Sequence, residues 1–247
     1  MKIESTQNST IKALAKLSSK KERDASGRFL IEGWHLLEEA SQAGLLEQVF
    51  QLETQPVFPN APTTFCSQAV LNKLSAQKSD ARYIGVCRKP DAHSLAEAKK
   101  VLLLDHLQDP GNLGTLIRSA VSFGLDAIVL SGDCADPYGP KAIQSSQGAL
   151  FHISVQTADL AKTIADLKAK AIPVFGAALH QNSKELHDLA IPACFAIMIG
   201  NEGQGIRPQL LAQCSSLVHI EMASFESLNA AIAGSILMYA FQFPSAD

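Results

Sequence analysis

The sequence predicts an α/β protein whose larger part is a mainly parallel sheet covered by helices on both faces. Short apolar runs such as 101–104, 127–130 and 195–199 alternate with helical segments. Strands that are buried on both faces are almost continuously apolar, and parallel strands need helical crossovers between them. Apolar residues make up 47% of the 247 positions, which is enough to fill a large core.

A smaller α/β unit is predicted for the first 88 residues. Asn8 is expected to begin a helix in which Ile11, Leu14 and Leu17 recur at helical spacing. The other expected elements are strands at 29–31, 49–52, 63–66 and 83–86 and helices at 34–43 and near 69–74. The polar, proline-bearing segment Lys89–His93 is the expected linker to the larger unit.

The larger unit begins with an apolar run and ends in a long apolar helix. Its expected strands are at 101–104, 127–130, 151–155, 173–177, 195–199 and 217–220. Its expected helices are at 113–123, 140–147, 158–169, 207–212 and 227–241. Because ligands bind beyond the carboxyl ends of the strands in open parallel sheets, we expect a site among the loops after Leu104, Ala177, Ile199 and Ile220.

Charge is divided unevenly along the chain. Residues 1–92 carry a net charge of +2 and residues 93–247 carry −5, and most of the basic excess lies within residues 1–28. A basic start on an acidic body is typical of a protein that touches nucleic acid with one end. On charge alone, the ordinary alternative of a solvated helix face is favoured.

Cysteines and apolar segments limit the cellular setting. The five cysteines are dispersed, form no C-x-x-C pair and have no histidine at metal spacing, so we expect reduced thiols and no metal. Residues 1–10 are polar, without an apolar signal region. The longest apolar stretch, Leu228–Phe241, is interrupted by Asn229 and Gly234 and is too short for a membrane span of about 20 residues. The sequence therefore predicts a cytoplasmic protein.

The first segment that points to chemistry is Asp109–Arg118. Pro110-Gly111 predicts a turn, and Asn112 is a natural N-cap for the helix that follows. Arg118 comes six residues later, so both side chains could face one substrate. The alternative, a capping asparagine and a surface arginine, is equally compatible with this spacing.

A second candidate segment, Gly200–Ile206, follows an apolar strand directly. Its three glycines would let the backbone approach a ligand closely. The segment is neither a P-loop nor a G-x-G-x-x-G motif. Glu202 is poorly placed for packing, which favours a functional role over a plain solvent-facing turn.

The third candidate segment, Phe225–Asn229, opens the last helix. Ser227 is expected to cap that helix, and Asn229 is expected to be a buried amide that needs hydrogen-bond partners. The small residues 230–234 allow close packing against another element or another subunit. A plain capped core helix is an equally good interpretation of this segment alone.

In their order and spacing, these three segments resemble the motifs of the SpoU family of RNA ribose methyltransferases. Residues 136–151 are similar to the family's segment between motifs one and two, and residues 8–33 to a substrate-binding domain that many members carry. The resemblance implies S-adenosylmethionine-dependent methylation of a ribose 2′-hydroxyl in RNA. Ribosomal RNA is implied ahead of transfer RNA, and the nucleotide cannot be inferred.

The resemblance also implies an architecture. Residues 1–92 would form the RNA substrate-binding domain and residues 98–247 the SPOUT methyltransferase domain, whose C-terminal part threads a deep trefoil knot. Knots are exceptions to the ordinary rules of chain connection. Family members are usually homodimers that pair through the knot region, which agrees with the small, apolar residues of the last helix.

Site residues follow from matching the motifs position by position. The reaction centre implied is Asn112, Arg118, Glu202, Ser227 and Asn229. The cofactor-binding positions implied are Ala177, Ala178, Gly200, Ile220, Met222 and Leu228. The candidates for RNA phosphate contacts are Lys12, Lys16, Lys20, Lys21, Arg23 and Arg28.

The role of Arg118 can be narrowed by chemistry. Arginine has a pKa above about 12, so we interpret it as a bidentate phosphate clamp that stabilises the developing alkoxide, not as a free base. Asn112 and Glu202 would orient it, while Ser227 and Asn229 would hold the ribose side of the site. Competing hypotheses are a catalytically silent RNA-binding protein of the same fold and an unrelated nucleotide-binding domain.

Two positions depart from the family pattern. Glu221 follows Ile220 where members commonly have proline, so the loop before the last helix is expected to differ in shape. Gln144 stands where many members have a basic residue, which would weaken the grip on RNA or change the substrate.

Overall fold

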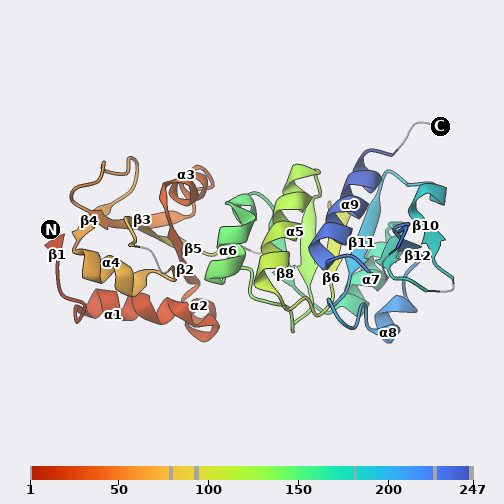
Figure 1. Cartoon of the computed structure of the whole chain (residues 1–247), viewed down its shortest axis with the longest axis horizontal. Coiled ribbons are helices and arrows are strands. Elements are labelled where there is room, and N and C mark those ends of the chain that lie inside the picture. The colour runs from red at the N-terminus through yellow and green to blue at the C-terminus, as the bar shows by residue number, and fades with distance from the viewer. Residues whose placement is uncertain (1, 78–79, 92–94, 181, 225–226, 245–247) are drawn as a thin grey trace. The chain divides into compact units, whose positions relative to one another are not determined.

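The computed structural model describes residues 2–77, 80–91, 95–180, 182–224 and 227–244, which are drawn in colour in Figure 1. The chain divides into two compact units. Unit 1 comprises residues 1–91 and 138–152, and unit 2 comprises residues 92–137 and 153–247. Ala92 and His93 of the expected linker, and Phe225 and Glu226 of the third motif, lie outside the described residues.

Unit 1 is built on a mixed five-stranded sheet with the order β1-β4-β3-β5-β2. Its strands are β1 (Lys2–Ile3), β2 (Arg28–Glu32), β3 (Leu46–Leu52), β4 (Thr63–Cys66) and β5 (Tyr83–Arg88). Strands β1 and β3 run parallel to β4, whereas β5 runs antiparallel to β2 and β3. The four strands expected in this part of the chain are present, and the two-residue β1 is too short to leave a sequence pattern.

Helices cover the sheet of unit 1. They are α1 (Ser9–Ala15), η1 (Lys16–Ser18), α2 (Lys20–Ser26), α3 (Trp34–Gln42), α4 (Gln68–Leu74), α6 (Pro140–Ser146) and η2 (Ala149–Phe151), where η marks a 3₁₀ helix. Asn8 caps α1 as expected, because its Oδ1 accepts the Thr10 amide at 2.9 Å. Ile11 and Leu14 join Val70 and Leu71 of α4 in one core cluster, so α1 and α4 lie side by side (Figure 1).

Unit 2 contains a seven-stranded sheet with the order β10-β12-β9-β11-β6-β7-β8, and every pairing in it is parallel. The strands are β6 (Lys100–Leu104), β7 (Ala127–Leu130), β8 (Ser154–Thr157), β9 (Val174–Ala177), β10 (Lys184–Glu185), β11 (Phe195–Ile199) and β12 (Ser216–His219). The predicted parallel sheet is confirmed. The strand expected at 151–155 is wrong at its start, because pairing with β7 begins only at Ser154.

Both faces of this sheet are covered. The helices of unit 2 are α5 (Pro110–Ser122), α7 (Leu160–Ala169), η3 (Leu186–Asp188), α8 (Pro208–Leu211) and α9 (Ala230–Gln242). Val101 and Leu103 pack with α7, whereas α5 and α9 cover the opposite face. On that face the Phe241 ring lies 4.9 Å from the Phe175 ring and 5.1 Å from the Phe195 ring, centre to centre.

The strand order places four loops at one edge. Because β12, β9, β11 and β6 are neighbours and parallel, the residues after their carboxyl ends lie together. The Ala178 amide, just beyond β9, donates to the Val218 carbonyl of β12 at 3.0 Å. The expectation that the loops after Leu104, Ala177, Ile199 and Ile220 share an edge is confirmed. Among the described residues, no helix has both the length and the apolar character needed to cross a membrane.

Candidate active site

The start of α5 differs from the sequence-based expectation. Asp109 is its N-cap, with Oδ1 accepting the Asn112 amide at 2.9 Å, and Pro110 occupies the first turn, where a missing N–H costs nothing. The prediction that Asn112 caps the helix is therefore wrong. Its side chain is left available for contacts outside the helix.

A chain of hydrogen bonds joins all three motifs. Asn112 Nδ2 donates to Glu202 Oε1 at 3.0 Å, and Asn229 Nδ2 donates to Asn112 Oδ1 at 3.1 Å. The Asp109 amide also lies 3.3 Å from Glu202 Oε1. Three of the five reaction-centre candidates, separated by up to 117 positions, therefore meet in one network.

The electrostatics of Glu202 suit an acceptor. Burial acts to raise the pKa of its carboxyl, but the hydrogen bonds from Asn112 and from backbone amides, including that of Asp109, outweigh burial. The net effect holds the pKa of Glu202 below its ordinary value of 4.5. The side chain is therefore a carboxylate at neutral pH, and it favours the arrangement that donates to it.

The start of α9 requires two corrections. Asn229, not Ser227, is the N-cap, because its Oδ1 accepts the Ala231 amide at 2.9 Å and the Ile232 amide at 3.3 Å. Asn229 is also exposed, whereas burial was expected. Ser227 is exposed, and its side chain forms no hydrogen bond with the described part of the chain.

Arg118 does not join this network. It lies exposed in the third turn of α5, six positions after Asn112, which places the two side chains about 120° apart around the helix axis. Asn112 and Glu202 bind each other, and among the described residues none forms an ion pair with Arg118. The guanidinium group is available to an external anion.

The Gly200–Ile206 loop is closed on itself. Asn201 and Gly205 exchange backbone hydrogen bonds of 3.0 and 2.9 Å, and Asn201 Oδ1 accepts the Gly203 amide at 2.9 Å. A Cβ atom at position 200 would lie 2.1 Å from the carbonyl carbon of Gly205. Glycine is therefore required at position 200 for the loop to fold back this tightly.

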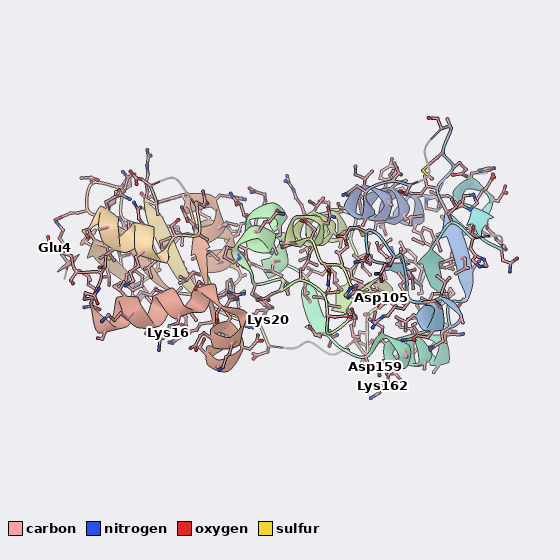
Figure 2. All side chains as sticks on the ribbon, turned by 60° about the horizontal axis from the view of Figure 1, so that its bottom comes forward. Glu4, Lys16, Lys20, Asp105, Asp159 and Lys162 are labelled. Atoms are coloured by element: carbon pink, nitrogen blue, oxygen red, sulfur yellow. The ribbon has the colours of Figure 1, made fainter. Side chains whose placement is uncertain are left out.

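Sequence reasoning missed a buried ion pair that anchors this loop. Asp105, directly after β6, is 0% exposed, and its Oδ1 lies 2.8 Å from Arg207 Nε and 2.5 Å from Arg207 Nη2. The Arg207 amide donates to the other carboxylate oxygen at 2.8 Å. Because Arg207 directly follows the Gly200–Ile206 loop, the pair ties the end of the loop to the end of β6. Asp105 is labelled in Figure 2. The only sequence signal was a single acidic residue ending an apolar strand.

The turn after Asp105 is also fixed by polar contacts. His106 adopts a left-handed backbone with φ of 55°, which non-glycine residues rarely do. Its amide donates to Ser131 Oγ at 2.8 Å, and its ring Nδ1 lies 2.9 Å from Asp133 Oδ2. The hydrogen bond from Ser131 is the largest influence on Asp133 and lowers the pKa of its carboxyl.

The expected cofactor-binding positions surround the same edge. Ala177 ends β9, Gly200 follows β11, and Ile220 follows β12. Ala177 and Ile220 are half-buried and Gly200 is buried, whereas Leu228 is 37% exposed. The other two positions of this set, Ala178 and Met222, are half-buried.

Comparison with known proteins shows which family has these motifs. The model of the SpoU rRNA Methylase family matches residues 99–239, and the model of the MRM3-like substrate binding domain matches residues 8–85. The chain is 37% identical over 243 residues to the 23S rRNA (guanosine(2553)-2′-O)-methyltransferase RlmP of Bacillus subtilis, covering 96% of this chain and 97% of that protein. The chain belongs to the SpoU family.

Solved structures agree with this assignment. A crystal structure of an RNA 2′-O ribose methyltransferase is 31% identical to this SpoU protein, with a TM-score of 0.81 and coverage of 97% of both chains. An rRNA methyltransferase from Sinorhizobium meliloti with bound AdoMet (S-adenosylmethionine) is 24% identical, with a TM-score of 0.87 and coverage of 98% of this chain and 97% of that one. At this lower identity the second structure shows the shared fold alone.

Glu221, which stands where SpoU members commonly have proline, contacts His187 in the structure. The Glu221 carboxylate accepts the His187 backbone amide at 3.0 Å and also contacts the His187 ring. These contacts link the loop after β12 to η3. The ligand atoms of Glu185, His187 and Glu221 lie within 4.8 Å of one another, a cluster that sequence spacing did not reveal.

His187 is expected to titrate above pH 6.5. The hydrogen bond with Glu221 is the largest influence raising the pKa of His187, and the backbone amide of His187 is the largest influence lowering the pKa of Glu221 to about 2. The stabilisation that protonated His187 gives to this contact is complete below the ordinary histidine pKa of 6.5. It is lost as pH rises through the raised pKa of His187. The stabilisation that ionised Glu221 gives is complete above pH 4.5, the ordinary pKa of the group. It is lost as pH falls through the lowered pKa of about 2. The contact is therefore strongest between pH 4.5 and 6.5.

Titration of the His187 ring protons by NMR measures this effect. Glu221→Gln should return the pKa of His187 toward 6.5, whereas Glu38→Gln, the same change at an exposed position of α3, should leave the pKa of His187 in place. A wild-type His187 that titrates at or below 6.5 would contradict the assignment.

Gly200→Ala is expected to lower the affinity for S-adenosylmethionine by at least about tenfold. The added methyl group would meet the Gly205 backbone at 2.1 Å, so the loop beside the expected cofactor positions must open. Gly203→Ala is the matched control, because the nearest atom to its Cβ would be 3.6 Å away. Isothermal titration with the cofactor compares the two variants, and equal affinities would refute the requirement.

The basic N-terminal residues of this SpoU protein divide into two groups. Lys12, Lys16, Lys20, Lys21 and Arg28 are exposed, and Figure 2 shows Lys16 and Lys20 extending from η1 and α2. Arg28 forms an ion pair with Glu47 at 2.7 Å. Arg23 is only 4% exposed and donates to the carbonyls of Leu17 at 2.7 Å and Ser18 at 2.9 Å. Its expected phosphate contact is wrong, because the side chain satisfies the carbonyls that end η1.

Proposed function

We propose that this SpoU protein transfers a methyl group from S-adenosylmethionine to a ribose 2′-hydroxyl of 23S ribosomal RNA. The hydrogen-bond chain from Asn229 through Asn112 to Glu202 carries the proposal, because it joins three separate motifs at the ligand-binding edge of a parallel sheet. Family membership and the name of the Bacillus subtilis relative support the reaction and the RNA. The AdoMet-bound structure of the same fold supports the cofactor.

The loops at the sheet edge fit a bent cofactor. S-adenosylmethionine supplies the electrophilic methyl group when it is bound. The backbone of Ala177, Ala178 and Gly200, whose side chains are small or absent, would hold it, and Ile220, Met222 and Leu228 would contact its apolar parts. The tight return of the backbone at Gly200 is the feature of this structure that suits such a contact.

In the reaction the ribose oxygen would bond to the methyl group as the sulfur–methyl bond breaks, and the hydroxyl proton would pass to solvent. Arg118 would clamp an RNA phosphate with two parallel N–H groups and stabilise the charge that develops on the ribose oxygen. Asn112, Glu202 and Asn229 would keep the three motifs in register around the ribose. Ser227, two positions before the Asn229 cap, would face the ribose or the cofactor.

Assembly and location belong to the same proposal. The apolar side chains Ile232, Ile236, Tyr239 and Phe243 recur every three or four residues and are 53%, 37%, 56% and 54% exposed. Such a stripe supports a homodimer that pairs through α9. Family membership supports a deep trefoil knot in the C-terminal part of residues 98–247. A ribosomal RNA substrate supports a cytoplasmic location.

Unit 1 would find the RNA through its exposed basic residues. The MRM3-like substrate binding domain model supports this role for the N-terminal domain, proposed as residues 1–92. The double variant Lys16→Gln/Lys20→Gln should weaken RNA binding and reduce the slope of log affinity against log salt by about 2. The control Lys99→Gln/Lys162→Gln removes two exposed charges from unit 2 and should leave the slope unchanged.

The reaction itself is tested with purified protein and radiolabelled cofactor. We expect label in ribosomal RNA and, in a strain that lacks the gene, loss of one 2′-O-methyl position that the wild-type gene restores. Label in transfer RNA alone would reject the ribosomal substrate. RNA binding without any methyl transfer would support the silent RNA-binding protein.

A further inference from the structure

Unit 1 contains a cavity, partly open to solvent, that the methyl-transfer proposal does not use. Its volume is about 560 Å³, within the range of about 300–1,000 Å³ typical of small-molecule sites. Apolar walls come from η1, β2 and the end of α4, and the remaining wall is the segment 138–144 around the start of α6. Segment 138–144 belongs to the residues that are similar to the SpoU segment between motifs one and two. The proposed methyl-transfer site gives this segment no role.

An acidic side chain lies in this cavity. Glu32 is half-buried at the end of β2, and its Oε2 accepts the Ser75 hydroxyl at 2.6 Å. Among the described residues, no other group hydrogen-bonds to this carboxylate, so Oε1 can accept from a ligand. Because the group is half-buried, water solvates it poorly, and burial raises the pKa of Glu32 against the opposing effect of the Ser75 hydrogen bond.

Aromatic and basic groups complete the lining. Tyr138 is the aromatic residue of the lining. Its ring packs against the buried Phe29 with centres 5.1 Å apart, and Lys89, which pairs with Asp24, places its Nζ 4.9 Å from the Tyr138 ring centre. Lys73 and Lys141, both exposed, also line the cavity. Apolar walls, exposed cations that suit phosphate and a carboxylate acceptor together fit the recognition of an unstacked RNA base.

We propose that this cavity holds one unstacked guanine of the RNA substrate, whose Watson–Crick edge donates to the Glu32 carboxylate. Guanine presents two adjacent donors on that edge, N1–H and the N2 amino group, whereas each other base presents one donor group there. A carboxylate, which only accepts, therefore favours guanine. This inference rests on the proposed RNA function and adds a residue that selects sequence.

Binding is tested by two-dimensional amide NMR on the full chain with the four nucleoside 5′-monophosphates. We expect guanosine monophosphate to shift the amide signals of Glu32, Ser75 and Ile143 and to bind at least about tenfold more tightly than the other three. Glu32→Gln should remove this preference, while the exposed control Glu38→Gln keeps it. An unchanged thermal midpoint for Glu32→Gln shows that the fold is intact, because glutamine has the same shape.

Four equal affinities, no shifts at these amides, or an unchanged preference in Glu32→Gln would each overturn the proposal. In methyl-transfer assays, Glu32→Gln should raise KM for RNA without lowering kcat or cofactor affinity, which a merely destabilised protein would not do. Guanine-selective binding in a wild-type protein that transfers no methyl would reject the proposed function alone. Methyl transfer without guanine selectivity would reject this inference alone.

Discussion

Replacing Arg118 with lysine is expected to slow methyl transfer to RNA by at least about 100-fold. The guanidinium presents two parallel N–H groups to a phosphate or a developing alkoxide, whereas an ammonium acts as a point charge. Loss of one donor that stabilises transition-state charge typically costs about 10² to 10³ in kcat. Arg118→Ala should lose at least as much, because no other described residue of α5 carries positive charge.

Single-turnover assays with labelled cofactor measure this loss in the chemical step. Cofactor affinity should stay at the wild-type value in both variants, since Arg118 lies outside the expected cofactor positions. Lys162→Gln removes an exposed cation from α7 and serves as the control for a general effect of charge. Near-wild-type turnover in Arg118→Lys would refute the bidentate clamp.

Arg207→Ala is expected to lower the free energy of unfolding of unit 2 by about 3 kcal/mol. The change leaves the fully buried Asp105 carboxylate with the backbone amide at position 207 but without its cation. Removing one partner of a buried ion pair typically costs about 3–5 kcal/mol, and the low end applies because Arg207 is 41% exposed.

Hydrogen exchange of the β6 and β11 amides measures this loss within the unit concerned. Adding Asp105→Asn to Arg207→Ala should restore part of the stability, because a neutral amide costs less to bury than an unpaired carboxylate. Arg82→Ala removes an exposed arginine and should change stability by less than about 0.5 kcal/mol. A loss below about 1 kcal/mol in Arg207→Ala would show that water replaces the ion pair.

The sheet of unit 2 could be predicted because its strands are recognisable one at a time. Each apolar run marks a buried strand, and parallel connections then place the ends of β6, β9, β11 and β12 together. The helix starts were harder, since several residues compete for each cap. Asp109 and Asn229 prevailed over the expected Asn112 and Ser227 because their side chains reach the first free amides.

The site was predictable only as a set of motifs. Spacing identified Asn112, Glu202 and Asn229 as candidates but could not show that they bond to one another and leave Arg118 outside. The Asp105–Arg207 pair spans 102 positions, so no local pattern records it. Arg23 was misjudged for the related reason that burial of a charged side chain depends on how α2 packs against η1. Roles at Ser227 and the cofactor positions stay predictions.

The composition of unit 1 has a practical consequence for dissecting this protein. The backbone passes from one unit to the other three times, after residues 91, 137 and 152, so no single cut separates the two. A fragment of residues 93–247 would keep α6 but lose the sheet with which it is grouped. Ile143, which lines a cavity together with residues of β2, and Phe151, whose ring centre lies 6.2 Å from that of Phe29, would then lose these neighbours. Such a fragment should aggregate or be cleaved near residues 138–152, and its inactivity would say nothing about whether the N-terminal residues bind RNA.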